Sequence, residues 1–127
     1  MNLREFLKEN RVYLDGGMGT LLQAKGLKPG ELPEHWNITH PDIIKDIHKA
    51  YFEAGSNIVC ANTFGANPLK FSDDELEKII SAAIKNAKDA IAETGNSENK
   101  FVALDMGSLG KLLKPLGVTA SRIAHGI

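Results

Sequence analysis

Three short apolar segments of this 127-residue chain each end in polar and small residues that could bind a ligand. These ends are residues 15–17 (Asp-Gly-Gly), 62–65 (Asn-Thr-Phe-Gly) and 105–107 (Asp-Met-Gly). If the apolar segments are parallel strands, their carboxyl ends meet at one edge of a sheet, where loop and helix amides are also free. The pattern predicts a site for a small polar ligand. The alternative is ordinary turn formation by Asp, Asn and Gly.

Other chemistry-bearing residues form no recognised catalytic or metal-binding pattern. The glycine-rich segment 16–19 is a weak nucleotide-binding candidate, because a dinucleotide fingerprint requires glycine at the position of Leu22. The four histidines lack the spacing of a metal site, and we expect His48 at the surface or boundary of a helix. Cys60 lies within an apolar segment, which predicts a small buried side chain rather than a nucleophile or ligand. We therefore assign no catalytic residue and no metal ligand.

The elements that would position these residues alternate between strands and helices. Apolar runs predict strands at residues 12–14, 57–61 and 101–104. Helical periodicity and end signals predict helices at residues 3–10, from Pro41 to Gly55, and from a Ser72–Glu75 capping pair through Ile91. Residues 18–40 are predicted to form a helical turn at 20–24 and then a long loop. This order predicts an α/β fold with a parallel sheet.

Composition and length narrow the class of protein. The chain has 15 Lys and Arg against 16 Asp and Glu and no basic cluster, so we expect no nucleic-acid partner. No apolar run approaches the roughly 18 residues of a membrane span, and no secretory signal is evident, so we expect no membrane partner and a cytoplasmic protein. The single cysteine excludes an internal disulfide or multi-thiolate zinc site within the chain. A complete eight-stranded barrel needs about 250 residues, which excludes that architecture here.

Four strings, in their order and spacing, resemble the opening of the homocysteine S-methyltransferase domain. They are residues 13–20 (Tyr-Leu-Asp-Gly-Gly-Met-Gly-Thr), 33–37 (Pro-Glu-His-Trp-Asn), the helix that begins Pro41-Asp42 and ends Ala54-Gly55, and residues 61–67 (Ala-Asn-Thr-Phe-Gly-Ala-Asn). Within that family the chain is most similar to the N-terminal module of cobalamin-dependent methionine synthases. The resemblance runs from about Val12 to Gly117 and covers the first part of the family's domain.

The resemblance implies an α/β chain that forms the first three β/α units of a (β/α)8 TIM barrel, truncated, with residues 1–117 as the N-terminal part of a homocysteine-binding domain. It implies transfer of a methyl group, from methylcobalamin, to the thiol of homocysteine, giving methionine. In the family that thiol is bound by zinc, which three cysteines hold. The substrate-binding residues carried over by position are Asp15, Gly16, Gly17, Asn62, Thr63, Phe64 and Asp105. Asp15 would pair with the ammonium of homocysteine, and the glycines would let the backbone approach closely.

Two segments depart from the family pattern. Residues 108–110 (Ser-Leu-Gly) stand where the family has Pro-Thr-Gly, and residues 118–127 are expected to be an unrelated C-terminal tail. The family's three cysteines would lie on later strands, and Cys60 matches none of them. We therefore expect a truncated or frameshifted product or one piece of a split gene, with the remainder of the barrel as a separate chain. Alone it is expected to bind neither zinc nor methylcobalamin and to be inactive. The alternative is a small, non-catalytic amino-acid-binding α/β module.

Overall fold

The computed structural model describes residues 2–107, whose centre is a short parallel sheet. Strands β1 (Ile58–Cys60) and β2 (Phe101–Ala103) pair along their whole length, and Leu14 joins β1 through a single parallel bridge. The three segments thus run in the same direction and lie side by side in sequence order. The predicted α/β class with a parallel sheet is confirmed. The departures predicted at 108–110 and 118–127 lie outside the described residues.

The first predicted strand, at residues 12–14, was wrong in extent, because only the bridge at Leu14 forms there. The Tyr13 carbonyl accepts the N–H groups of both Asn57 (2.7 Å) and Ile58 (3.2 Å). The Asn57 side chain in turn accepts the Tyr13 N–H at 3.1 Å. Because these bonds converge on one residue, no regular ladder precedes Leu14. β1 and β2 are also shorter than the predicted 57–61 and 101–104.

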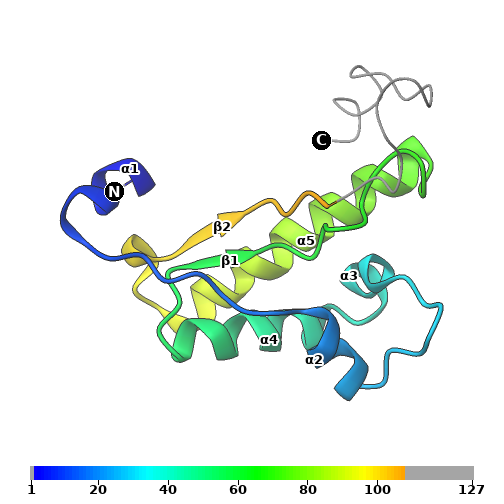
Figure 1. The fold of residues 1–127 in the computed structure, drawn as a ribbon, viewed down its shortest axis with the longest axis horizontal. Helices are drawn as coiled ribbons and strands as arrows, with labels where there is room; N and C mark the ends of the chain where they lie inside the picture. Colours follow the sequence, from blue (N-terminus) through cyan, green and yellow to red (C-terminus); the bar gives the residue numbers. More distant parts are fainter. Residues whose placement is uncertain (1, 108–127) are drawn as a thin grey trace.

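Two long helices, α4 (Pro41–Glu53) and α5 (Asp73–Thr94), run alongside the sheet (Figure 1). Their inner faces pack on the strands in a cluster of Phe52, Val59, Ala87 and Ala90, with Val102 against it. The predicted end signals are confirmed: Pro41 lies in the first turn of α4, Gly55 follows it with φ 114°, and Ser72 and Glu75 form a capping box at the start of α5. Within residues 2–107, no helix is both long and apolar enough to cross a membrane.

Shorter helices complete the described chain. They are α1 (Leu3–Glu9), α2 (Gly19–Ala24), the 3-10 helix η1 (Pro33–His35), α3 (Trp36–Thr39) and the 3-10 helix η2 (Ser97–Asn99). α2 confirms the predicted turn at 20–24, whereas the predicted loop that follows contains η1 and α3. Those helices form because Trp36 is buried in a cluster with Leu22, Ile44 and Ile47. That cluster fixes residues 33–39 against α4.

His48 of α4 corrects the prediction that this residue lies at the surface or boundary. Its side chain is 0% exposed, and neither ring nitrogen has a hydrogen-bond partner among the described residues. The physical reason is helical spacing: Ile44, Ile47 and Tyr51 share its face of α4, and all three pack into the core. Burial lowers the pKa of His48 to about 4, so the imidazole is neutral at physiological pH.

Candidate functional site

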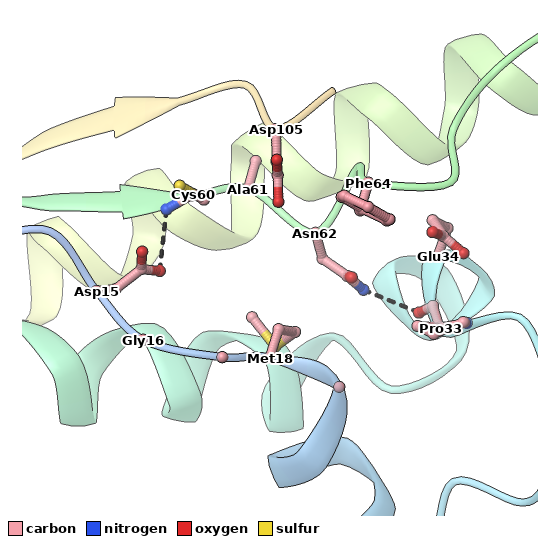
Figure 2. A pocket seen from close by; sticks show the side chains of 12 residues that line it. Asp15, Gly16, Met18, Pro33, Glu34, Cys60, Ala61, Asn62, Phe64 and Asp105 are labelled. Atoms are coloured by element: carbon pink, nitrogen blue, oxygen red, sulfur yellow. Dashed lines mark hydrogen bonds between the residues drawn. The ribbon is translucent and has the colours of Figure 1, made fainter. Parts of the chain in front are cut away.

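A pocket of about 400 Å³ opens where the three sheet segments end (Figure 2). That volume lies within the range of small-molecule sites. Its lining includes six of the seven residues predicted to bind substrate, namely Asp15, Gly16, Gly17, Asn62, Phe64 and Asp105. The structure therefore brings the three polar strand ends together around one cavity, as the sequence predicted. Whether these residues bind homocysteine stays a prediction.

Asp15 directly follows the Leu14 bridge, and its Oδ2 accepts the backbone N–H of Cys60 at 3.0 Å. The pKa of Asp15 is raised, chiefly by burial and further by the nearby Asp105 carboxylate, although the hydrogen bonds from Cys60 oppose the shift. None of the described lining residues is Lys, Arg or His. This part of the pocket therefore has a negative potential that favours a cationic ligand group.

Cys60 lines the pocket beside Asp15 and is only partly buried. The prediction of a buried side chain was therefore wrong in extent, because the strand ends at Cys60, where the pocket opens. Burial raises the pKa of its thiol to about 11, and the carboxylates of Asp15 and Asp105 contribute to the shift. The thiolate is the reactive and metal-binding form of cysteine. At neutral pH Cys60 is therefore a protonated thiol, unsuited to nucleophilic attack.

We predict that Cys60 reacts with iodoacetamide about a hundredfold more slowly at pH 7.5 than a thiol of ordinary pKa, because a pKa raised from 9.0 to about 11 leaves that much less thiolate. The rate is measured by mass spectrometry, and the control is the same chain unfolded in urea. Asp15→Asn removes a neighbouring negative charge and should accelerate the reaction in the folded chain. Equal rates in the folded and unfolded chains would contradict the prediction.

Thr63 is the predicted substrate-binding residue that does not line the pocket. It is 3% exposed, and its Oγ1 both donates to the Asp105 carbonyl (2.7 Å) and accepts the Asp105 N–H (3.0 Å). A second link joins the same two segments, since the Phe64 carbonyl accepts the Gly107 N–H at 3.0 Å. Thr63 thus fixes the segment after β1 to the segment after β2 and so positions Asp105.

Asn62 is held at the pocket by a buried amide pair. Its Nδ2 donates to the Pro33 carbonyl (2.8 Å) and to Asn37 Oδ1 (2.9 Å), while Asn37 Nδ2 donates back to the Asn62 carbonyl (2.8 Å). No residue in the described range donates to Asn62 Oδ1. Asn62 therefore presents a free acceptor atom in a fixed amide orientation.

The absence of a side chain at Gly16 lets Tyr51 of α4 approach the loop after Leu14. The Tyr51 hydroxyl donates to the Gly17 carbonyl at 2.7 Å, and a Cβ on Gly16 would lie 2.9 Å from that hydroxyl oxygen. Burial and the Asp15 carboxylate raise the pKa of Tyr51, which keeps its proton available for this bond. A side chain at position 16 would therefore displace the Tyr51 hydroxyl from the Gly17 carbonyl or move the loop away from α4.

Six further lining residues were not predicted, and they are Met18, Gly19, Pro33, Glu34, Cys60 and Ala61. Met18 and Gly19 continue the Asp15–Gly17 segment, so their position beside it could have included them. Pro33 and Glu34 come from a string noted for its family resemblance, but its place in the fold could not be inferred without the contacts to Asn62. Residues 33–34 thus form a wall of the pocket that comes from outside the strand ends.

The sequence of residues 12–125 matches the family model described as homocysteine S-methyltransferase. The chain belongs to the homocysteine S-methyltransferase family. The resemblance deduced from the four strings is thereby confirmed. The match extends to residue 125, so the separate tail expected at 118–127 stays a prediction.

Curated relatives in this family are much longer than the chain. It is 32% identical over 128 residues to the methionine synthase of Mycobacterium tuberculosis, covering 93% of this chain and 11% of that protein. It is 31% identical over 134 residues to the methionine synthase of Mycobacterium leprae, covering 98% of this chain and 11% of that protein. The chain therefore corresponds to about a tenth of each relative.

Solved structures of a homocysteine methyltransferase share the fold of this chain. The metallated form of the homocysteine methyltransferase MmuM from Escherichia coli superposes with a TM-score of 0.72 at 23% identity, over 85% of this chain and 42% of that one. Its oxidised form gives a TM-score of 0.68 at 24% identity, over 83% of this chain and 40% of that one. The described residues thus have the fold of part of that enzyme.

The zinc expected for this family does not fit the described residues. Within residues 2–107, no three His, Cys, Asp or Glu side chains lie together as a metal site requires. Cys60 is the one cysteine of the chain, and its raised pKa disfavours the thiolate that zinc binds. We therefore assign no step of a metal-dependent reaction to these residues.

Proposed function

We propose that Leu14, β1 and β2 are the first three strands of a homocysteine S-methyltransferase (β/α)8 barrel, and that α4 and α5 are the helices of its first two units. Two observations support this assignment. The three segments are parallel neighbours in sequence order, as consecutive barrel strands are. The superposition on MmuM covers 42% of that chain, which is close to three units of eight.

We further propose that the pocket binds the amino-acid end of homocysteine. The observation that carries this proposal is the pair of acidic residues, Asp15 and Asp105, at a pocket edge without a basic residue in its described lining. An ammonium group would be accepted by the Asp15 carboxylate and by Asn62 Oδ1. The backbone at Gly16 and Gly17 would lie close enough to contact the ligand. These groups would fix the orientation of the amino acid.

The reaction proposed for the completed barrel is methyl transfer to the homocysteine thiol, giving methionine, with methylcobalamin as donor. Zinc, where the family binds it, supplies a deprotonated thiol at neutral pH. The residues of this chain would bind and orient homocysteine, and Asp15 would keep its ammonium at one end of the pocket. The metal-binding cysteines and the donor site would come from polypeptide that carries the remaining units.

The 127-residue chain studied alone should be inactive. We expect that it neither retains stoichiometric zinc after dialysis nor forms methionine from homocysteine and methylcobalamin, because it has one cysteine and because no three potential metal ligands lie together within residues 2–107. Zinc is measured by atomic absorption and methionine by mass spectrometry. Retained zinc at one equivalent, or methionine above the enzyme-free control, would show that this chain holds a complete site.

The binding proposal is tested by replacing Asp15 with asparagine. Loss of a charge-assisted hydrogen bond is expected to weaken the affinity for L-homocysteine by about tenfold to a hundredfold. Calorimetric titration gives the dissociation constants, and Asp46→Asn on the exposed side of α4 is the control of equal charge change. The raised pKa of Asp15 also predicts a pH dependence. As the pH is lowered, the affinity of the wild-type chain for homocysteine should begin to fall at a higher pH than it would with an aspartate of ordinary pKa. Equal affinities for the two variants would refute the role of Asp15.

A further inference from the structure

Glu34 of η1 is a carboxylate buried in the pocket wall that the proposed binding of homocysteine does not use. It is 4% exposed, and it lines the pocket together with Pro33. Figure 2 shows it across the pocket from Asp15. A buried carboxylate is costly unless donors or an opposite charge compensate it, so its presence in the wall needs a physical reason.

One carboxylate oxygen has a structural role. Glu34 Oε1 accepts the backbone N–H of Gly65 at 2.6 Å, and a Cβ at position 65 would collide with the carboxylate. The bond adds to those from Asn62 and Asn37, which join the same two segments. Positioning of the turn after β1 requires only one acceptor atom, and a neutral amide oxygen would provide it.

The other oxygen, Oε2, has no donor among residues 2–107. Among the described residues, the fully buried side-chain polar atoms without a hydrogen-bond partner are the two ring nitrogens of His48. Oε2 of Glu34 also lacks a partner but does not belong to this set, so it is not fully buried. Oε2 therefore retains accessible surface, and Glu34 is a lining residue of the pocket. A carboxylate oxygen in this position is an acceptor for a ligand donor, and its charge favours a cationic one.

We propose that Glu34 is a second ligand-binding residue of this pocket, which accepts a cationic N–H group such as an ammonium at the end away from Asp15. The inference rests on the pocket of the proposed function, but not on homocysteine as its ligand. It assigns Glu34 two roles, because Oε1 holds the turn at Gly65 and Oε2 binds the ligand. Small organic ammonium compounds should therefore bind beside Gly65.

Glu34→Gln separates the two roles, because the glutamine oxygen still accepts the Gly65 N–H whereas the charge is lost. The backbone amide of Gly65 is the reporter in ¹H–¹⁵N spectra, and the probes are n-butylammonium chloride and sodium butyrate. In the wild-type chain, butylammonium should shift the Gly65 amide signal in a saturable manner, and butyrate should not. Glu34→Gln should weaken that response by about tenfold, whereas Glu53→Gln, which removes an exposed charge from α4, should match the wild type.

Three results would overturn the proposal. The first is a response of Glu34→Gln to butylammonium that equals that of the wild type. The second is a saturable shift of the Gly65 amide signal with butyrate. The third is a melting temperature of ligand-free Glu34→Gln that lies several degrees further below the wild type than that of Glu53→Gln. The last result would show that the charge serves the fold rather than a ligand. A wild-type chain that binds butylammonium at Gly65 but not homocysteine would refute the proposed function and leave the role of Glu34 intact.

Discussion

Replacing Asn37 with aspartate is expected to lower the free energy of unfolding by about 3–5 kcal/mol at pH 7, the range for an uncompensated buried charge. Asn37 is 1% exposed, and its Nδ2 donates to the carbonyls of Asn62 (2.8 Å) and Ile79 (3.3 Å). Aspartate has nearly the same shape, so it creates no cavity. It places a charged oxygen opposite two carbonyl oxygens. Urea denaturation of the two chains measures the difference.

The pH dependence identifies the cause of that loss. Burial should raise the pKa of the introduced carboxyl in the folded chain above its unfolded value, so the folded state takes up the proton first as the pH falls. The protonated group donates a hydrogen bond again, and the stability deficit should shrink toward pH 4. Asn99→Asp, on the exposed helix η2, is the control and should change the stability by less than about 0.5 kcal/mol. A small effect of Asn37→Asp at pH 7 would mean that the buried amide pair is not required.

The sequence was sufficient to predict the part of the pocket formed by the strand ends, because that part depends on local signals. Asp15, Asn62 and Asp105 each follow an apolar run, and parallel strands bring such ends together without further information. The helix boundaries at Pro41, Gly55 and Ser72 were likewise encoded locally, through a fixed φ, a positive φ and a capping side chain.

The features that could not be predicted depend on contacts distant in sequence. Glu34 belongs to a residue type that is rarely buried, and its burial follows from the N–H of Gly65, 31 positions away. Asn37 and Asn86 lie 49 positions apart, and their bond joins α3 to α5. Thr63 was assigned to the substrate by its position in the family resemblance, but its hydroxyl bonds the Asp105 backbone instead. Residue type alone also misplaced His48, although its spacing put it on the apolar face of α4.

The last prediction concerns His48, which should make the fold sensitive to acid. The unfolded chain protonates this residue near its ordinary pKa of 6.5, whereas burial lowers the pKa in the folded chain to about 4. Between these two pKa values the unfolded state binds a proton that the folded state excludes. The stability contributed by the neutral imidazole is therefore fully present above pH 6.5 and falls as the pH decreases toward 4. The loss from this residue should reach about 3 kcal/mol near pH 4, at 1.36 kcal/mol for each unit of pKa shift.

His48→Leu tests this by removing the titrating group from a site that is already apolar. The variant should lose about 3 kcal/mol less stability than the wild type between pH 7 and pH 4, measured by urea denaturation at each pH. The matched control is Ile44→Leu, a substitution on the same buried face of α4 that leaves every titrating group in place and should keep the wild-type pH dependence. Because other groups that titrate over this range are shared by all three chains, the difference in slope isolates His48. Parallel stability curves for His48→Leu and the wild type would contradict this prediction. They would mean that the protonated imidazole finds a hydrogen-bond acceptor in the folded chain, whereas neither ring nitrogen has a partner among the described residues.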